Sequence, residues 1–218
     1  MKGLFINLSP HRNGTSALLL TLLNEQLEQS AELWHLTDLI REWERFIQAA
    51  QHADTWVFAT PCYVNAIPGD ALSVLEKLQE ESITDTKLVY ALAQGGMPYA
   101  HTHHCCISTI ELLSEAMQLQ WMGGFILGGG AMIHGESLNL LPNARQVKRS
   151  LYKVASCVQH QSYLVDELTQ QAQLHMPVWL TWLLSRKMNA AIHKQQKQLG
   201  LYRQVCPYVR EEAYENKG

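Results

Sequence analysis

Charged residues are scarce in this sequence. Asp, Glu, Lys and Arg make up 17% of its 218 residues, against about 25% in an average soluble domain. The net charge is −3, and no run of Lys or Arg exceeds two residues. This argues against a nucleic-acid partner that depends on phosphate neutralisation. A surface poor in charge instead predicts a bound ligand or an oligomer interface.

Long hydrophobic runs are missing as well. The longest nearly apolar stretch, residues 121–133, is too short and too rich in glycine for a membrane span, which needs about 20 residues. The first apolar run, residues 4–8, has the length of a strand rather than of a secretory signal core. The five cysteines are odd in number and irregularly spaced, unlike a disulfide framework. We therefore expect a cytoplasmic, reduced protein without integral membrane contact.

Strand and helix patterns alternate along most of the chain. Short apolar runs occur at 4–8, 31–36, 55–59, 88–92 and 124–127, separated by turns and by apolar residues at helical spacing. Because the runs are almost continuously apolar, they predict a parallel α/β sheet that is covered on both faces.

The last part of the chain has a different pattern. Two long helical stretches, 143–173 and 177–199, follow Pro142. Pro177 is placed as a first-turn proline and Gly200 as a helix stop. We expect a first domain over 1–171 and a helical extension over 172–218.

The extension carries an apolar stripe that needs a cover. Two tryptophans, Trp179 and Trp182, lie beside residues that recur every four positions: Leu180, Leu184, Met188 and Ile192. Three uses stay open: packing on the first domain, a homodimer arm, or an interfacial membrane helix. The third would use the basic residues Arg186, Lys187, Lys194 and Lys197.

A polar loop at residues 9–16 separates the first strand from the first helix. Ligands of open parallel sheets bind at the carboxyl ends of strands, and a helix start offers free N–H groups to a phosphate. Ser9, Thr15 and Ser16 add hydroxyl groups, Arg12 a charge and Gly14 conformational freedom. Neither the P-loop nor the dinucleotide fingerprint is present. The alternative is an ordinary N-cap turn.

A second loop, residues 60–69, follows the third strand with the sequence Thr-Pro-Cys-Tyr-Val-Asn-Ala-Ile-Pro-Gly. Together with the first loop and with Gln94-Gly95-Gly96, it resembles the flavodoxin-like NAD(P)H-dependent FMN reductases. His11 stands where that family usually has Arg, and Thr15-Ser16 replaces Asn-Thr. The resemblance covers roughly residues 1–130.

The resemblance implies a three-layer flavodoxin-like fold with a five-stranded parallel sheet in the order 2-1-3-4-5. It also implies an FMN site. By this likeness the FMN phosphate and ribityl chain are held by Ser9, His11, Arg12, Asn13, Gly14, Thr15 and Ser16. The flavin ring is lined by Pro61, Cys62, Tyr63 and Val64, and its other side is closed by Gly95, Gly96 and Tyr99.

The implied function is that of an FMN-dependent oxidoreductase. It would take a hydride from NAD(P)H and reduce a quinone, a nitro or azo compound, or free flavin. The flavin supplies the chemistry, so no catalytic side chain is named, and a homodimer is expected. A flavodoxin-type electron carrier without nicotinamide use is the alternative, against which the modest acidity argues. A flavin-binding regulator is a third reading.

The cysteines and histidines are ambiguous. Iron–sulfur relatives carry a cysteine cluster after the second strand, whereas residues 34–53 contain no cysteine. On a helix, His101, His104 and Cys105 would share one face and could bind zinc with an outside ligand. Packing at a helix start is the favoured alternative, and no metal is expected. Cys62 is interpreted as a buried spacer without a partner thiol, and Gly128-Gly129-Gly130 as a loop leading out of the sheet.

Overall fold

The computed structural model describes residues 2–175 and 177–198, and the chain divides into two compact units between Leu174 and His175. The first unit contains the sheet, and the second contains α8 (Val178–Gln198). The expected boundary at Gln171 falls inside α7 (Asp166–Ala172), a helix that packs on the last strand of the first unit.

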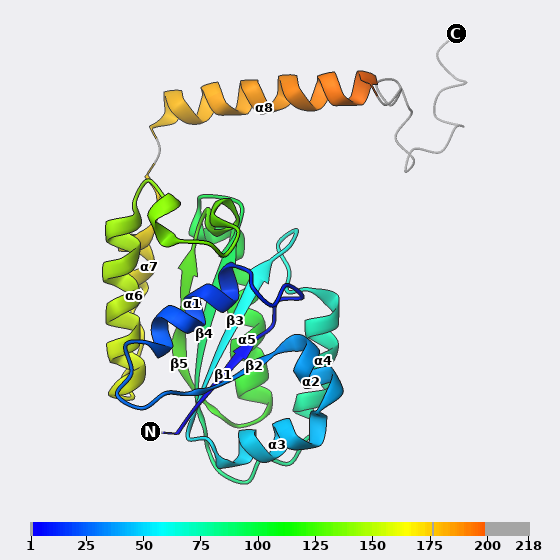
Figure 1. Ribbon diagram of the computed structural model, residues 1–218, viewed down its shortest axis with the longest axis vertical. Coiled ribbons are helices and arrows are strands. Elements are labelled where there is room, and N and C mark those ends of the chain that lie inside the picture. Colours follow the sequence, from blue (N-terminus) through cyan, green and yellow to red (C-terminus); the bar gives the residue numbers. More distant parts are fainter. Residues whose placement is uncertain (1, 176, 199–218) are drawn as a thin grey trace, which may run out of the picture. The chain divides into compact units, whose positions relative to one another are not determined.

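The first unit is built on a five-stranded sheet (Figure 1). All neighbouring strands are parallel, in the order β2-β1-β3-β4-β5, which confirms the expected flavodoxin-like topology. The chain order reverses between β1 and β3, so their carboxyl ends form the switch point where ligands of such sheets bind. The strands are β1 (Gly3–Asn7), β2 (Glu32–His35), β3 (Thr55–Cys62), β4 (Leu88–Gly95) and β5 (Gln120–Leu127).

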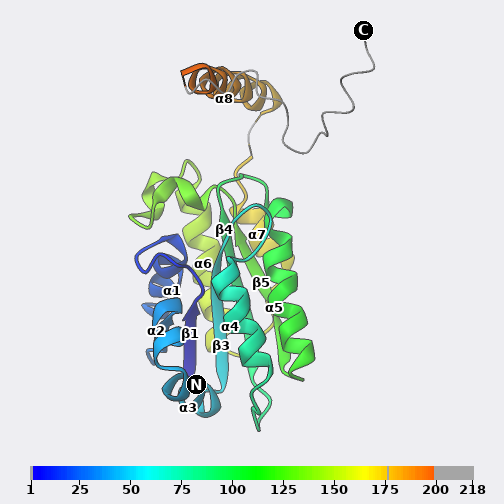
Figure 2. The same cartoon turned by 90° about the vertical axis from the view of Figure 1, so that its right-hand side faces the viewer.

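Helices cover both faces of the sheet, and Figure 2 shows α1 and α6 on one side with α4 and α5 on the other. One face is covered by α1 (Thr15–Asn24), α6 (Ala144–Gln159) and α7. The opposite face is covered by α2 (Leu36–Arg41), α3 (Trp43–His52), α4 (Gly69–Gln79) and α5 (His104–Ala116). Short 3-10 helices are η1 (Ala100–His103), η2 (Gly130–Ile133) and η3 (Leu138–Leu140).

Successive strand residues point into two separate cores. Phe5 and Val57 belong to the core under α1 and α6, whereas Leu4 and Trp56 belong to the core under α4 and α5. All eight residues of β3 are buried. This explains why the strands are apolar without alternation, since each face of a covered parallel sheet must exclude water.

Strand β3 runs further than its sequence indicates. The strand was expected to end before Thr60, yet it continues through Pro61 to Cys62, paired with β4. Proline cannot donate to a ladder. Here β1 ends opposite Ala59, and Leu8 makes the last backbone bond on that side. Pro61 shares the orientation of Ala59, so its missing N–H would face a side where no strand remains.

The helical stretch expected over 143–173 is broken into α6 and α7. Gln161 adopts a left-handed conformation with φ 53° and reverses the chain after α6. The following segment lies along the open edge of β5, where Leu164 N–H donates to the Met122 carbonyl at 2.7 Å. Gly123 (φ 109°) leaves room there, because a Cβ atom would lie 2.9 Å from the Leu164 carbonyl oxygen. A continuous helix could not cover this edge.

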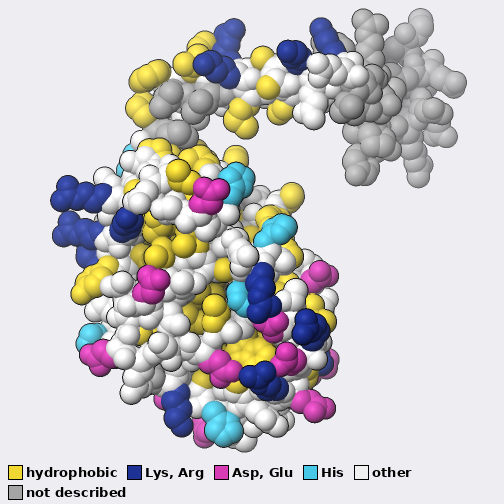
Figure 3. Space-filling model, in the orientation of Figure 1, with side chains coloured by type: hydrophobic (Ala, Val, Ile, Leu, Met, Phe, Trp, Pro, Cys, Tyr) yellow, Lys and Arg dark blue, Asp and Glu magenta, His cyan; other side chains and the backbone are white. Residues whose placement is uncertain are grey.

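The second unit carries exposed aromatic side chains on α8. Trp179 is 66% exposed and Trp182 is 58% exposed, and the guanidinium of Arg186 lies 4.7 Å from the ring centroid of Trp182. Hydrophobic and basic side chains both appear on this helix in Figure 3. Within residues 2–175 and 177–198, no helix combines the length and the hydropathy needed to cross a membrane.

Only part of the expected stripe on α8 can be followed. Met188 and Ile192 are exposed on the helix. The side chains of Leu180 and Leu184, and all of Gly200, lie outside the described part of the chain.

The close packing of α5 on β5 yields a test. A Cβ atom at Gly124 would lie 2.6 Å from Cγ2 of Ile107, a buried side chain of α5. We expect Gly124→Ala to lower the free energy of unfolding by about 1–3 kcal/mol through overpacking, measured by urea denaturation. Gly69→Ala is the matched control, because nothing lies within 4 Å of its added Cβ. Equal stability of the two variants would contradict the packing argument.

Candidate functional site

A cavity of about 510 Å³ lies at the carboxyl end of the sheet. This volume falls in the range of about 300–1,000 Å³ typical of small-molecule sites. Four separate stretches of chain contribute: the loop after β1 with the start of α1, the turn after β3, the end of β4, and the loop after β5. The lining residues are Ser9, His11, Asn13, Gly14, Thr15, Tyr63, Gln94, Ala131 and His134.

The loop after β1 is held by its own side chains. The Ser9 amide donates to Asn7 Oδ1 at 3.1 Å, and the His11 amide donates to Ser9 Oγ at 3.1 Å. Asn7 is in turn paired with His35 Nδ1 at 3.0 Å. These bonds shape the backbone that leads to Gly14, the extended N-cap residue of α1.

The N-terminus of α1 is free to bind an anion. The first amides of an α-helix have no acceptor within the helix, and no side chain caps α1 at Gly14. Asn13, Gly14 and Thr15 at this helix start line the cavity. Ser16 is fully buried, and its hydroxyl contacts Gln94 Nε2 at 3.5 Å. The helix start therefore offers backbone donors and the positive end of its dipole to the cavity.

The Thr15 hydroxyl is engaged within the protein. It donates to the Gly130 carbonyl at 2.8 Å and accepts from the Gly135 amide at 3.2 Å. Gly135 has φ 79°, and a Cβ atom there would lie 2.1 Å from the Asn13 carbonyl oxygen. The glycine-rich loop after β5 thus packs against the loop after β1 and forms a wall of the cavity, a role beyond leading the chain out of the sheet.

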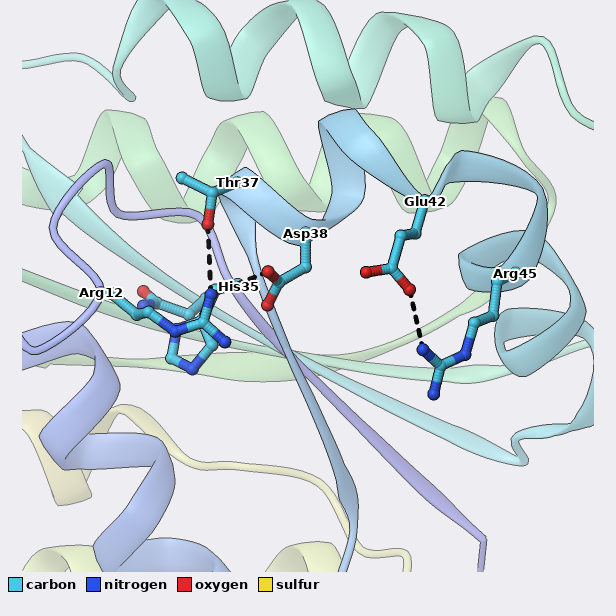
Figure 4. A network of polar contacts seen from close by, with 7 residues as sticks. Arg12, His35, Thr37, Asp38, Glu42 and Arg45 are labelled. Carbon is cyan, nitrogen blue, oxygen red and sulfur yellow. Dashed lines mark hydrogen bonds and ion pairs between the residues drawn. The ribbon is translucent and has the colours of Figure 1, made fainter.

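Arg12 does not line the cavity; its side chain is directed toward Thr37 and Asp38 (Figure 4). Its guanidinium donates to Asp38 Oδ1 at 2.7 Å and to Thr37 Oγ1 at 3.4 Å. The hydrogen bond from Arg12 lowers the pKa of the Asp38 carboxyl. In this structure, Arg12 is thus paired with α2 rather than aimed at the position where the resemblance implies the phosphate.

The turn after β3 has an unusual backbone. Tyr63 and Ala66 exchange two backbone hydrogen bonds, of 2.9 and 3.0 Å, around Val64 (φ 50°) and Asn65 (φ 58°). Two consecutive left-handed residues define a type I′ turn, which is strained at a β-branched residue. Val64 is 99% exposed, and Tyr63 is 46% exposed against the cavity. Such strain in an exposed turn is typical of a binding loop.

The other residues that were expected to contact the flavin ring lie at different places in the structure. Pro61 lies within β3, and the Cys62 thiol points toward η1, 3.7 Å from the Thr102 carbonyl. Gly95 gives space to the buried His103 ring, because a Cβ atom would lie 2.3 Å from its Cε1. The remaining two lie further along the loop after β4. Gly96 is exposed near Ala131, and Tyr99 stacks on His101 with centroids 5.8 Å apart.

Three lining residues were missed by the sequence reasoning. Gln94 belongs to a loop recognised as similar to a flavin loop, but it was not chosen as a site residue. Ala131 and His134 come from the segment after the triple glycine, and His134 is held in a left-handed conformation with φ 47°. The only sequence signal for them was the Gly-rich stretch directly after an apolar strand.

A cysteine group lies on the other side of the β3 turn. The Sγ atoms of Cys62, Cys105 and Cys106 all lie within 4.8 Å of one another. Cys62 is buried, as expected, but the expectation that it has no partner thiol is wrong. Burial raises the pKa of the Cys62 thiol and, more strongly, that of Cys106.

The proposed ligand trio of His101, His104 and Cys105 is not assembled. The two histidines line a separate cavity of about 440 Å³ between α5 and β5. The Cys105 thiol instead donates to the Asn65 carbonyl. The reason is local: α5 begins only at His104, so His101 lies in η1 and not on the same helix.

The sheet order, the switch-point cavity and the uncapped α1 define the class of flavodoxin-like α/β proteins. Within this class, residues 1–131 match the family model of the NADPH-dependent FMN reductases, and the chain belongs to that family. None of the curated proteins compared with the sequence matches it.

Solved structures share the fold at low sequence identity. An apo NADH:FMN oxidoreductase is 18% identical with a TM-score of 0.57, covering 77% of this chain and 93% of its own. An FMN-dependent NADH-azoreductase from Bacillus anthracis, solved with FMN, is 15% identical (TM-score 0.53, 73% and 100% covered). An NAD(P)H:quinone oxidoreductase from Methanothermobacter marburgensis is 14% identical (TM-score 0.52, 76% and 98% covered).

Membership of this family makes the protein an NAD(P)H-dependent FMN oxidoreductase, with FMN as cofactor and NAD(P)H as co-substrate. The residues present fit FMN. The uncapped start of α1 suits a phosphate, and Gly135 admits the close approach of two loops around it. Tyr63 adds an aromatic side chain to the lining of the cavity.

The engaged Thr15 hydroxyl yields a second test. Thr15→Val removes a donor and an acceptor with little change in volume, and it takes this partner from the buried Gly130 carbonyl and the partly buried Gly135 amide. We expect a loss of about 1–3 kcal/mol in stability and at least about tenfold weaker FMN binding, measured by quenching of flavin fluorescence. Thr15→Ser keeps the hydroxyl and is the control. Wild-type affinity in the valine variant would show that the cavity does not depend on this contact.

Proposed function

We propose that FMN occupies the 510 Å³ cavity, with its phosphate at the start of α1 and its ring against the Tyr63–Ala66 turn. The observation that carries this assignment is the uncapped helix start inside a cavity framed by three loops. Ser9, His11, Asn13, Gly14 and Thr15 then border the phosphate and ribityl end. Ser16 contributes through its backbone amide, since its hydroxyl is buried against Gln94.

At the ring end, the residues of this chain position the flavin and exclude water, and none of them takes part in the reaction itself. The amides of Val64 and Asn65 are proposed to face the polar edge of the flavin, because the type I′ turn leaves them outside the two bonds between Tyr63 and Ala66. FMN held by these residues would supply the redox chemistry that links hydride donation by the nicotinamide to reduction of the acceptor. No side-chain acid or base is required.

The proposed acceptor is a flat, uncharged, conjugated compound, such as a quinone or an aromatic nitro or azo compound. Large exposed apolar side chains occur in the loops that follow β3, β4 and β5: Tyr63, Val64, Met97 and Met132. Among the described lining residues there is no Asp, Glu, Lys or Arg. A charged acceptor, such as a second FMN molecule, would find no cationic side chain there to pair with its phosphate.

The experiment follows the reduction of FMN by the nicotinamide separately from its reoxidation by the acceptor. Purified protein loaded with FMN should bleach on addition of NADPH or NADH under anaerobic conditions, with no second protein present. Colour should return on adding a benzoquinone. A flavin that stays oxidised with both nicotinamides, yet exchanges electrons with a protein partner, would favour a carrier instead.

Substitutions of the exposed residues Met97 and Met132 test the proposed class of acceptor. Met97→Gln with Met132→Gln should raise the KM for a benzoquinone by about fivefold to tenfold, because apolar contact area is lost. The rate of bleaching by NADPH should not change. Leu112→Gln on α5, also an exposed apolar position, is the control. The acceptor proposal fails if free FMN is reduced faster than any quinone and if its rate of reduction is the same in the wild type and in the double methionine variant.

We further propose that the protein acts as a cytoplasmic homodimer and that α8 serves as the dimer arm. The support is the exposed pair Trp179 and Trp182, with Met188 and Ile192 further along the helix. Exposed apolar surface of this kind is typical of interaction sites, and a symmetric interface would account for the low content of charge.

Charged substitutions on α8 test the arm. Trp179→Glu with Trp182→Glu should convert a dimer to a monomer in sedimentation velocity. Tyr152→Glu, an exposed aromatic position on α6, should leave the dimer intact. A dimer that survives the double change removes α8 from the interface, and sedimentation of the wild type with anionic vesicles would favour a membrane role.

A further inference from the structure

Three cysteine side chains converge where β3 ends beside the first turn of α5. Cys62 is the last residue of β3, and Cys105 and Cys106 follow directly on the first residue of α5. Their three Sγ atoms lie within 4.8 Å of one another, and those of Cys105 and Cys106 are 4.0 Å apart. Within the described residues, no other three His, Cys, Asp or Glu side chains converge in this way.

We propose that Cys62, Cys105 and Cys106 form a binding site for one thiophilic metal ion, of which Zn²⁺ is the representative. With a zinc–sulfur bond of about 2.3 Å, tetrahedral ligands stand about 3.8 Å apart. The sulfur atoms need to close by about 1 Å or less to reach that separation. Three thiols give up three protons as three metal–sulfur bonds form, and no electron is transferred.

The surroundings supply an entrance and a fourth ligand. Cys62 and Cys106 are buried, whereas Cys105 is partly exposed, so an ion can enter on its side. The Asn65 carbonyl oxygen already contacts the Cys105 thiol and is available for the fourth position. Water is an alternative fourth ligand, as in open zinc sites.

A disulfide explains the arrangement less well. A disulfide joins two sulfur atoms at about 2.05 Å, and it would leave the third cysteine of this group without a function. Three converging thiols match the ligand set that soft metal ions prefer.

The position of the site connects it to the flavin cavity. Asn65 belongs to the turn whose first residue, Tyr63, lines that cavity. An ion held by Cys62 and Cys105 would tie the end of β3 to α5 directly beneath this turn. The metal site itself does not depend on the flavin proposal and can be tested in the protein without FMN.

The experiment titrates the full-length, reduced, metal-free protein without any histidine tag. Zn²⁺ is followed by competition with a chromophoric chelator, and Cd²⁺ by its ultraviolet thiolate charge-transfer band. We expect one ion per chain and, at the zinc absorption edge, three sulfur neighbours at about 2.3 Å. Cys105→Ser should weaken zinc binding by about 100-fold or more and reduce the cadmium band.

Matched controls keep the result interpretable. Cys157→Ser combined with Cys206→Ser removes the other two cysteines, the second of which lies outside the described residues; it should bind like the wild type. Cys105 is chosen because its partial exposure lets the variant fold, which circular dichroism verifies. Equal zinc affinity in Cys105→Ser and wild type, or a cadmium band lost only in the control, would overturn the proposal.

Discussion

One buried hydroxyl group joins the two loops on which the cofactor cavity depends. Thr15 is the first residue of α1, and its side chain bonds both the Gly130 carbonyl and the Gly135 amide. Because these partners lie 115 and 120 residues further along the chain, the contact forms only when the sheet is complete. It holds the loop after β5 against the helix start and so shelters the free amides of α1 on one side.

At the phosphate position proposed above, the cavity offers backbone donors rather than basic side chains. Arg12, the cation closest in sequence to the helix start, is paired with Asp38. The described lining residues include two histidines, His11 and His134, but no Lys or Arg. An uncapped helix start can stabilise a dianion without a nearby cation, because its amides are fixed in direction before binding. This agrees with a sequence that carries little charge.

Most of the sheet could be read from the sequence. Five apolar runs became five strands, and helices cover both faces, because burial on two faces leaves a clear signal in composition. Ends of elements were less predictable. Pro61 reads as a strand terminator, but the neighbouring strand β1 had already ended. Gln161 interrupts a periodic helical pattern, and Gly123 leaves room on β5, because the segment after α6 covers the edge of that strand.

The sequence by itself predicted the alternation of strands and helices and the two loops after β1 and β3, and its resemblance to a known family implied the strand order and an FMN site. These are local patterns, because each residue type influences the conformation of the segment in which it stands. Tertiary structure decided the partner of each side chain: Arg12 turned to Asp38, and Thr15 turned to Gly130. It also brought Cys62 to a pair of cysteines more than 40 positions away. These side-chain partners depend on which strand ends lie next to one another in space. The spacing of residues along the sequence does not reveal which ends those are.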